Sequence, residues 1–267
     1  MATNPVGKGT QTIGVVVSNF NDPFFGKVIK QIQTLAYEKE YLLTLAGFLN
    51  NEPNDRDLKP LFDNSIDGLI VLGTDLKAEW LERFQNIPVA RIGHGRENEK
   101  SVCITIDEYY AANLIINHLV DSGRKKLLLI STDTHVHQLR SEAFERVALE
   151  RSVELTIRQS PQGDPHDVGV RMATEVDVAE IDALICTNDQ MAMGALYTLK
   201  ERDIHVPNNL VVTGFDDIYE ASRFIPSITT IQQPIAEMVT TAIDAIIKKS
   251  PPAHIDLPSS LVVRRSA

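Results

Sequence analysis

Four oxygen-rich side chains late in the chain are the residues best suited to bind a polar ligand. Asn188 and Asp189 follow one short apolar run, and Asp216 and Asp217 follow the next. Carboxylates accept hydrogen bonds, and an amide both accepts and donates them. Gathered at one place, these groups suit a small molecule that is rich in hydroxyl groups or bears an amine.

The segment around these residues is predicted to bring them to one edge of a sheet. Ala183–Cys186 is a short apolar run typical of a buried strand, and Leu210–Thr213 is a second one. Between them, Met191, Ala195 and Leu199 recur at helical spacing and give one apolar face. A strand, a helix and a strand form a right-handed parallel unit, and ligands of such sheets bind beyond the carboxyl ends of the strands.

Other polar residues follow predicted strands elsewhere in the chain. They are Asn21-Asp22, Thr74-Asp75 and Asp133. Taken singly, each is more typical of a helix cap or a turn than of a ligand contact. Taken as a set that faces one cleft between two lobes, they predict a binding site.

Two aromatic residues and one arginine each allow two interpretations. Phe24 and Phe25 pack in the core, or one ring presents a flat apolar face to a sugar or a base. Arg140 is solvated near Glu142 or Glu145, or it offers forked donors at the mouth of a cleft.

Signals of catalysis and of metal binding are weak in this sequence. It contains neither a glycine-rich phosphate loop nor a Gly-x-Ser-x-Gly elbow. His135 and His137 have a spacing that can chelate a metal, but no third ligand stands at a recognisable spacing, so a solvated loop is predicted. Cys186 has no histidine nearby in the sequence and is interpreted as structural. We therefore expect that this protein is not an enzyme and that it has neither a metal site nor a cofactor.

Predicted strands and helices alternate along the whole chain, and the alternation restarts near Leu127 after a long predicted helix, 107–121. This pattern predicts an α/β protein with two similar lobes, each a doubly wound parallel sheet.

The composition sets further bounds. A chain of 267 residues with 43% apolar content favours about two domains with a sizeable core. No apolar run approaches the ~18 residues of a membrane helix, and the first residues lack a signal-peptide core. The net charge of −10 argues against nucleic-acid binding through the bulk surface, so contact with DNA needs a separate basic module. Cys103 and Cys186 lie in apolar runs typical of buried free thiols in a reducing compartment.

Several motifs together resemble the effector-binding core of the LacI family of bacterial transcription repressors. They are Ile13-Gly14-Val15-Val16-Val17, Asp22-Pro23-Phe24-Phe25, Ile66-Asp67-Gly68-Leu69-Ile70, Asn117-His118-Leu119, Arg140-x-x-Ala143-Phe144, Thr187-Asn188-Asp189-x-Met191-Ala192-x-Gly194-Ala195-Leu196, Gly214-Phe215-Asp216-Asp217, Thr229-Thr230-Ile231-Gln232-Gln233-Pro234 and Leu261-Val262-Val263-Arg264. The matches cover almost the whole chain in the family's order. Periplasmic sugar-binding proteins share the fold but less of the later series.

The resemblance implies two lobes of the periplasmic binding protein-like type I fold, with a ligand cleft between them. Three chain crossings are expected, near Ile106, near Gln233 and after Lys249. The expected domains are a lead-in at 1–11, a first lobe of 12–106 plus 234–252, and a second lobe of 107–233 plus 253–267.

The resemblance also implies which residues contact the ligand. The matched positions are Phe24, Phe25, Arg140, Asn188, Asp216 and Gln233, with Asp22, Thr74 and His94 as further candidates. Two departures affect this set: Gly93 stands where many members have Asp, and Pro165 stands where many have an aromatic residue. His94 or His166 is the candidate replacement.

On this resemblance the chain is expected to be the sensing and dimerising core of a cytoplasmic repressor, binding a small molecule, above all a sugar. The family's helix-turn-helix headpiece, which would precede Thr10 and bind operator DNA, is not in these residues. The alternative is an extracytoplasmic sugar receptor of a transport system. A third interpretation, an enzyme on the same fold class, would need a nucleophile and base in the cleft.

Overall fold

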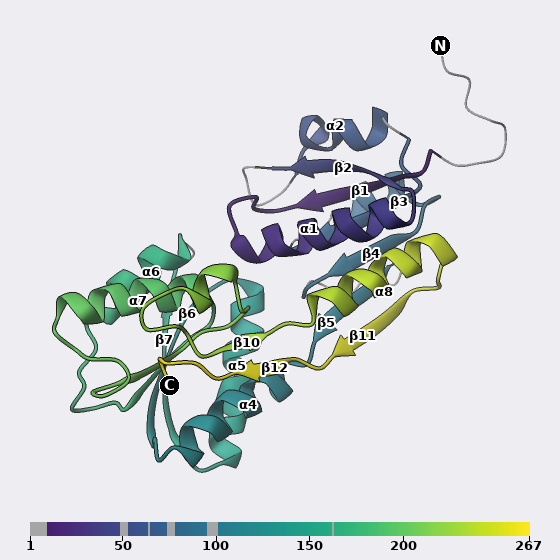
Figure 1. Ribbon diagram of the computed structural model, residues 1–267. Coiled ribbons are helices and arrows are strands. Elements are labelled where there is room, and N and C mark those ends of the chain that lie inside the picture. Colours follow the sequence, from purple (N-terminus) through teal and green to yellow (C-terminus); the bar gives the residue numbers. More distant parts are fainter. Residues whose placement is uncertain (1–9, 49–52, 64, 74–77, 95–100, 162) are drawn as a thin grey trace. The chain divides into compact units, whose positions relative to one another are not determined.

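The computed structural model describes residues 10–48, 53–63, 65–73, 78–94, 101–161 and 163–267. The chain divides into two compact units (Figure 1). Unit 1 comprises Met1–Ile106 and Pro234–Leu257, and unit 2 comprises Asp107–Gln233 and Pro258–Ala267. Each unit is therefore built from two separate stretches of chain.

Unit 1 is a six-stranded parallel sheet with helices on both faces, and its strand order is β11-β5-β4-β3-β1-β2. Its strands are β1 (Thr12–Val17), β2 (Leu42–Gly47), β3 (Gly68–Leu72), β4 (Val89–Ile92), β5 (Val102–Ile106) and β11 (Ala253–Leu257). Its helices are α1 (Pro23–Glu38), α2 (Asp55–Asp63), α3 (Ala78–Arg83) and α8 (Ile235–Lys248). Helices α1 and α8 lie side by side, and α8 covers β3, β4 and β5.

Local sequence signals explain where the helices of unit 1 begin and end. Asp22 caps α1 by accepting a 2.9 Å hydrogen bond from the backbone N–H of Phe24, and Pro23 occupies the first helical position, where its missing N–H costs nothing. Helix α8 ends at Lys249, which adopts a left-handed conformation with φ of 52°. Asp22 is therefore a helix cap, one of the two interpretations that the sequence allows for it.

One expected domain boundary is wrong. Residues 253–257 were expected in the second lobe, but they form β11, which pairs in parallel with β5 from Ala253↔Val102 to Leu257↔Ile106. The backbone ladder places this strand at the edge of the unit 1 sheet, so the chain enters unit 2 for the last time only at Pro258.

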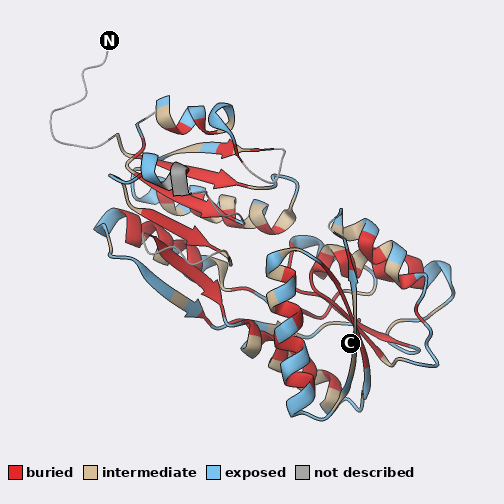
Figure 2. Ribbon diagram, turned by 180° about the vertical axis from the view of Figure 1, so that it is seen from behind, coloured by how far each residue is buried: buried red, intermediate tan, exposed pale blue. Residues whose placement is uncertain are grey.

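Unit 2 is a four-stranded parallel sheet in the order β7-β6-β8-β9, with an additional antiparallel pair, β10 and β12. Its strands are β6 (Lys126–Thr132), β7 (Glu154–Ser160), β8 (Ala183–Cys186), β9 (Val211–Thr213), β10 (Thr230–Gln232) and β12 (Ser260–Val262). Its helices are α4 (Glu108–Asp121), α5 (His135–Glu150), α6 (Pro165–Ala173), α7 (Asp189–Glu201) and the short 3₁₀ turn η1 (Tyr219–Ser222). Strands β1, β3, β4 and β5 of unit 1 and β6, β8 and β9 of unit 2 are largely buried, whereas β2, β7 and β11 are partly exposed (Figure 2).

Two glycines let α6 and α7 pack backbone to backbone. A Cβ atom on Gly169 would lie 2.0 Å from the carbonyl oxygen of Met191, and one on Gly194 would lie 2.1 Å from that of His166. Both distances are far below van der Waals contact, so no side chain fits at either position. This close contact fixes α7, whose first residues belong to the polar cluster described below.

The α/β class and the doubly wound parallel sheets predicted from the sequence are confirmed, with the antiparallel pair as an addition. Helix α6 begins at Pro165, because a proline fits the first helical position and Asp164 caps the helix. His135 and His137 were expected in a solvated loop, but they open α5, and His137 is buried. Among the described residues no helix is long and apolar enough to span a membrane.

Candidate functional site

Polar groups meet at the carboxyl edge of the unit 2 sheet, where β8 and β9 end. The side chain of Asn188 caps α7 by accepting a 2.8 Å hydrogen bond from the N–H of Met191. The backbone N–H of Asp189 donates to the carbonyl of Phe215 at 2.8 Å, which joins the two loops directly. Asn188 and Asp216 are thereby brought to one edge, as the strand-helix-strand pattern predicts.

The loop after β9 has an unusual backbone. Asp216 and Asp217 adopt φ values of 103° and 48°, a region that side-chain-bearing residues rarely occupy. Asp216 is held there by its backbone N–H, which donates to the carbonyl of Ile231 at 2.9 Å, and by Gln233, whose Nε2 donates to its Oδ1 at 2.6 Å. Backbone strain of this kind is concentrated at ligand sites.

Arg140 is the central cation of this cluster and is only 4% exposed. Its Nε and Nη2 donate to the two carboxylate oxygens of Glu108 at 3.0 and 3.1 Å, and its Nη1 donates to the carbonyl of Thr187. Its guanidinium carbon lies 3.5 Å from the centre of the Phe215 ring, and Nη1 lies 3.8 Å from Oδ1 of Asp216. The interpretation of Arg140 as a solvated side chain near Glu142 or Glu145 is therefore wrong, because Arg140 is buried and its carboxylate partner is Glu108.

Burial and neighbouring charges shift the pKa values of Arg140 and His137. Burial alone would lower the pKa of Arg140, but the carboxylates of Glu108 and Asp216 outweigh it and raise that pKa. For His137, burial and then the positive charge of Arg140 lower the pKa to about 3, so this ring is neutral. Its Nδ1 lies 2.6 Å from the hydroxyl of Thr132.

Asp189 is a buried carboxyl beneath the loops rather than an exposed acceptor. It is 0% exposed, and burial raises its pKa to about 7, despite hydrogen bonds that lower it. Those hydrogen bonds come from the hydroxyl of Thr230 at 2.6 Å and the backbone N–H of Ile218 at 2.8 Å. A Cβ atom on Gly214 would lie 2.1 Å from its Oδ1, so glycine is required there. Asp189 thus ties the two loops together.

Asp217 is neutralised by its own partners. Nη2 of Arg264 donates to one of its oxygens, and Nε2 of Gln232 donates to the other at 2.8 Å. The acceptor-rich cluster predicted from the sequence therefore separates into three roles: Asn188 and Asp216 lie at the edge, Asp189 is structural, and Asp217 is paired.

The described candidates in unit 1 lie at the start of α1 and after β4, and Thr74 lies outside the described residues. Phe24 is 8% exposed and Phe25 is partly exposed, with ring centres 5.6 Å apart. The ring of Phe25 covers Gly73, where a Cβ atom would lie 2.0 Å from its Cζ. Asp22 serves as the cap of α1, and His94 follows β4. Phe24 therefore belongs to the core, and Phe25 is the partly exposed ring of the two.

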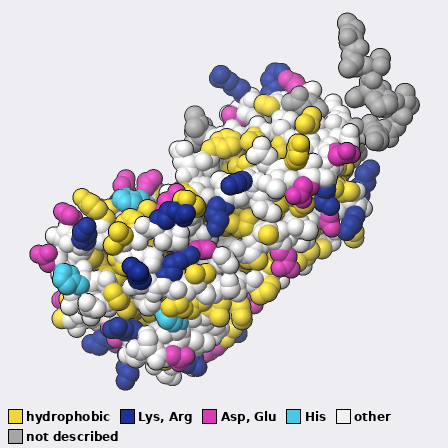
Figure 3. All heavy atoms as spheres, in the orientation of Figure 1, with side chains coloured by type: hydrophobic (Ala, Val, Ile, Leu, Met, Phe, Trp, Pro, Cys, Tyr) yellow, Lys and Arg dark blue, Asp and Glu magenta, His cyan; other side chains and the backbone are white. Residues whose placement is uncertain are grey.

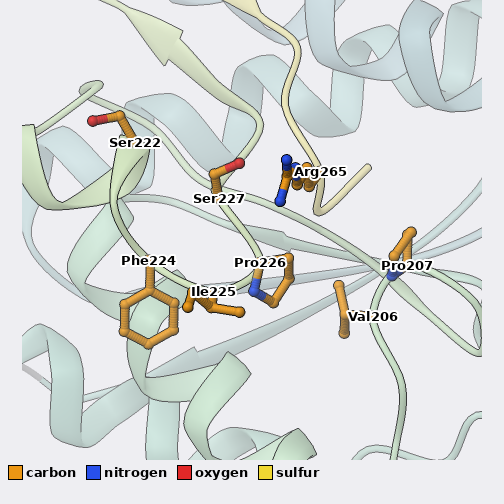
Figure 4. Close-up of a pocket in the computed structure, with 8 residues that line it drawn as sticks. All are labelled: Val206, Pro207, Ser222, Phe224, Ile225, Pro226, Ser227 and Arg265. Carbon is orange, nitrogen blue, oxygen red and sulfur yellow. The ribbon is translucent and has the colours of Figure 1, made fainter.

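A separate hollow of about 510 Å³ lies elsewhere on unit 2 (Figure 4). Its lining residues are Val206, Pro207, Ser222, Phe224, Ile225, Pro226, Ser227 and Arg265. None of them is a predicted site residue, so the hollow gives no support to the cluster around Arg140.

Sequence reasoning missed Glu108, the ring of Phe215 and the carbonyl of Thr187 as partners of Arg140. Glu108 follows the helix cap Asp107, and an acidic residue in a first helical turn is usual for its effect on the helix dipole alone. The 32 residues that separate Glu108 from Arg140 carry no spacing signal for their contact.

Comparisons with known proteins identify the class. The model of the periplasmic binding protein-like domain family matches residues 116–267, more than half of the chain, and the chain belongs to this family. Its curated relatives are LacI-type transcription regulators. The HTH-type transcriptional repressor PurR of Histophilus somni (strain 2336) is 27% identical over 272 residues, covering 96% of this chain and 81% of the relative. The HTH-type transcriptional regulator GalR of Escherichia coli (strain K12) is 28% identical over 244 residues, covering 87% and 70%.

Solved structures share the fold. A periplasmic binding protein/LacI transcriptional regulator from Alkaliphilus metalliredigens QYMF, complexed with D-xylulofuranose, has a TM-score of 0.83 at 23% identity and covers 96% of this chain and 99% of that one. A LacI family regulator from Enterococcus faecium with bound ribose has a TM-score of 0.83 at 21% identity, covering 96% and 98%. The dimeric Lac repressor with an 11-residue C-terminal deletion has a TM-score of 0.84 at 20% identity, with the same coverage.

Proposed function

We propose that this chain is the effector-sensing core of a LacI-type transcription regulator and that it binds a neutral, hydroxyl-rich small molecule, in particular a sugar. Support comes from curated relatives that are transcription regulators and that align with this chain over most of their length. Two structural neighbours with a bound pentose add to it. The observation that carries the proposal is the buried polar cluster at the carboxyl edge of the unit 2 sheet, centred on Arg140 and Asp216.

The geometry suits hydroxyl recognition. Asp216 is partly exposed in a strained loop, and its neighbours Gln233 and Asn188 add amide groups that both donate and accept. A sugar hydroxyl has one donor and two acceptor positions, so a mixture of carboxylate and amide partners can satisfy it.

The two rival functions receive less support. An extracytoplasmic sugar receptor is disfavoured because the curated relatives are repressors. An enzyme would need an activated nucleophile beside a base. The buried thiol of Cys186 does not fit that role, since burial, with Asp189 adding to it, raises its pKa well above the ordinary value. We therefore propose a non-catalytic protein of the cytoplasm.

The assembly proposed for the intact regulator is a homodimer that binds operator DNA through a headpiece outside these residues. Ligand binding would shift the chain between two states with different DNA affinity. Unit 1 is the proposed site of self-association, through α2 and the region of Trp80, and a stable interface there should bury at least ~1,000 Å². A monomer at tens of micromolar in sedimentation would count against the dimer.

The test of ligand binding is a thermal-shift screen of neutral pentoses and hexoses, D-ribose among them, and of free nucleobases, followed by calorimetric titration of each hit. Asp216→Ala should abolish or weaken the response. Glu142→Ala, an exposed residue of the same unit, should leave it unchanged. A hit whose affinity is the same in the native chain and in Asp216→Ala would show that the polar cluster is not the ligand site.

A further inference from the structure

Arg140 would be a receptor for anions if its charge were free. A guanidinium binds carboxylates and phosphates through paired N–H donors, and burial strengthens such contacts. In this chain, however, the paired donors Nε and Nη2 already face the two oxygens of Glu108, and Nη1 faces the carbonyl of Thr187. One of the two edges through which a guanidinium binds an anion, the pair Nε and Nη2, is thus occupied by a carboxylate of the protein itself.

The charge balance around Arg140 also disfavours an anion. Glu108 and Asp216 are two carboxylates beside one cation, while the burial-lowered pKa of His137 leaves that ring neutral. Asp217 is balanced by Arg264, and Asp189 lies beneath the loops with a pKa raised to about 7. The carboxylates of Glu108 and Asp216 therefore lie close to any ligand that approaches Arg140, and they repel an anionic ligand at short range.

Glu108 is fixed well enough to impose this selection. It is 8% exposed and sits in the first turn of α4, which Asp107 caps by accepting from the N–H of Tyr110 at 2.8 Å. The face of the Arg140 guanidinium rests on the ring of Phe215, so the cation cannot swing away from its partner without losing that contact.

Taking the ligand site from the proposed function, we propose that Glu108 is a specificity-determining residue: by occupying the fork of Arg140, it makes the site select neutral ligands and reject phosphorylated or carboxylated ones. Arg140 then acts on the ligand through the donors that Glu108 leaves and through the position of Asp216. Removing the negative charge of Glu108 should convert the same arginine into an anion receptor.

The test compares Glu108→Gln with the native chain and with Glu150→Gln. Glu150 is the matched control, because it pairs with Arg146 on the surface of unit 2 at 3.1 Å. Calorimetry measures the Kd of D-ribose, ribose 5-phosphate and inorganic phosphate for each. In Glu108→Gln the ratio of the Kd for ribose 5-phosphate to that for ribose should fall at least about tenfold, or ~1.4 kcal/mol, and inorganic phosphate should bind more tightly by a similar factor.

The double variant Glu108→Gln, Arg140→Gln assigns the effect to the arginine, since without the cation the gain in anion binding should disappear. Unchanged ratios in a folded Glu108→Gln, an equal gain in Glu150→Gln, or a gain that survives in the double variant would each overturn the proposal.

Two further outcomes remain decisive. If the native chain binds no sugar or nucleobase, the proposed function fails separately, and the titration with inorganic phosphate still decides the role of Glu108. If Glu108→Gln is unfolded, circular dichroism in rising phosphate replaces calorimetry, with sodium chloride of equal ionic strength as the control. Recovery of folding in phosphate alone supports the proposal, and no difference between the salts overturns it.

Discussion

Replacing Asp189 with asparagine should change how the stability of this protein depends on pH. Asp189 is buried, and burial raises its pKa from 3.8 to about 7. In the unfolded chain the carboxyl loses its proton near its ordinary pKa, whereas in the folded chain it keeps the proton up to about pH 7. Between these values the folded state binds more protons, so this group's contribution to the free energy of unfolding falls as pH rises.

The size of the effect follows from the shift. A difference of about three pKa units, at 1.36 kcal/mol per unit, corresponds to roughly 4 kcal/mol lost between pH 4 and pH 7 as an upper value. Asparagine is neutral throughout, and it can keep both hydrogen bonds: its oxygen accepts from the N–H of Ile218, and its amide donates to the hydroxyl of Thr230 after that hydroxyl rotates. We therefore expect Asp189→Asn to gain stability relative to the native chain as pH rises.

The assay is urea denaturation of both chains at several values between pH 4 and pH 8, with the difference in free energy of unfolding plotted against pH. All other titrating groups cancel in this difference. Asp133→Asn, an exposed carboxylate of the same unit, is the control and should run parallel to the native chain. Parallel curves for Asp189→Asn across the whole range would refute the argument that burial holds this carboxyl protonated.

Three other predictions concern packing, ligand binding and DNA. Gly194→Ala should destabilise the protein by about 1–3 kcal/mol, because its Cβ would lie 2.1 Å from the carbonyl of His166; thermal denaturation measures this, and an unchanged melting temperature would contradict the close contact of α6 and α7. Asp216→Ala should weaken binding of a screened ligand by about 5- to 150-fold, since each unpaired hydroxyl costs roughly 1–3 kcal/mol; a lower melting temperature with unchanged affinity, measured by calorimetry, would make Asp216 a turn residue only. The 267 residues should by themselves form no specific DNA complex in a gel-shift titration at moderate salt, because their net charge is −10 and acidic and basic side chains are interspersed over the face in Figure 3. Tight sequence-specific binding would show that these residues hold a DNA site.

Local signals predicted most of the fold. Buried strands such as Ala183–Cys186 are uniform apolar runs, and the cap and proline at Asp22-Pro23 set the start of α1 at the observed residue. Strand β11 was missed because it is an edge strand with three of its five residues exposed, so its sequence, AHIDL, lacks the apolar run of a buried strand. Only its pairing with β5 reveals it.

The candidate site was predicted in part, and the limit has a physical cause. Topology alone brings Asn188 and Asp216 to one edge, because both follow parallel neighbouring strands. The contact between Glu108 and Arg140 arises from the packing of α4 against α5, so it cannot be predicted from the types and spacing of side chains in the sequence. The raised pKa of the Asp189 carboxyl likewise depends on its full enclosure, which an acidic residue at a helix start does not indicate.

The division of each unit into two stretches of chain has a consequence for biosynthesis. When the ribosome has released the first 106 residues, β5 is still an open sheet edge, because α8 and β11 come from residues 235–257. The antiparallel pair of unit 2 is also incomplete at that stage, because β12, the partner of β10, comes from residues 260–262. Neither unit can complete its sheets until residues 253–262 have emerged, so we expect the edge of β5 to be exposed to chaperones in the interval.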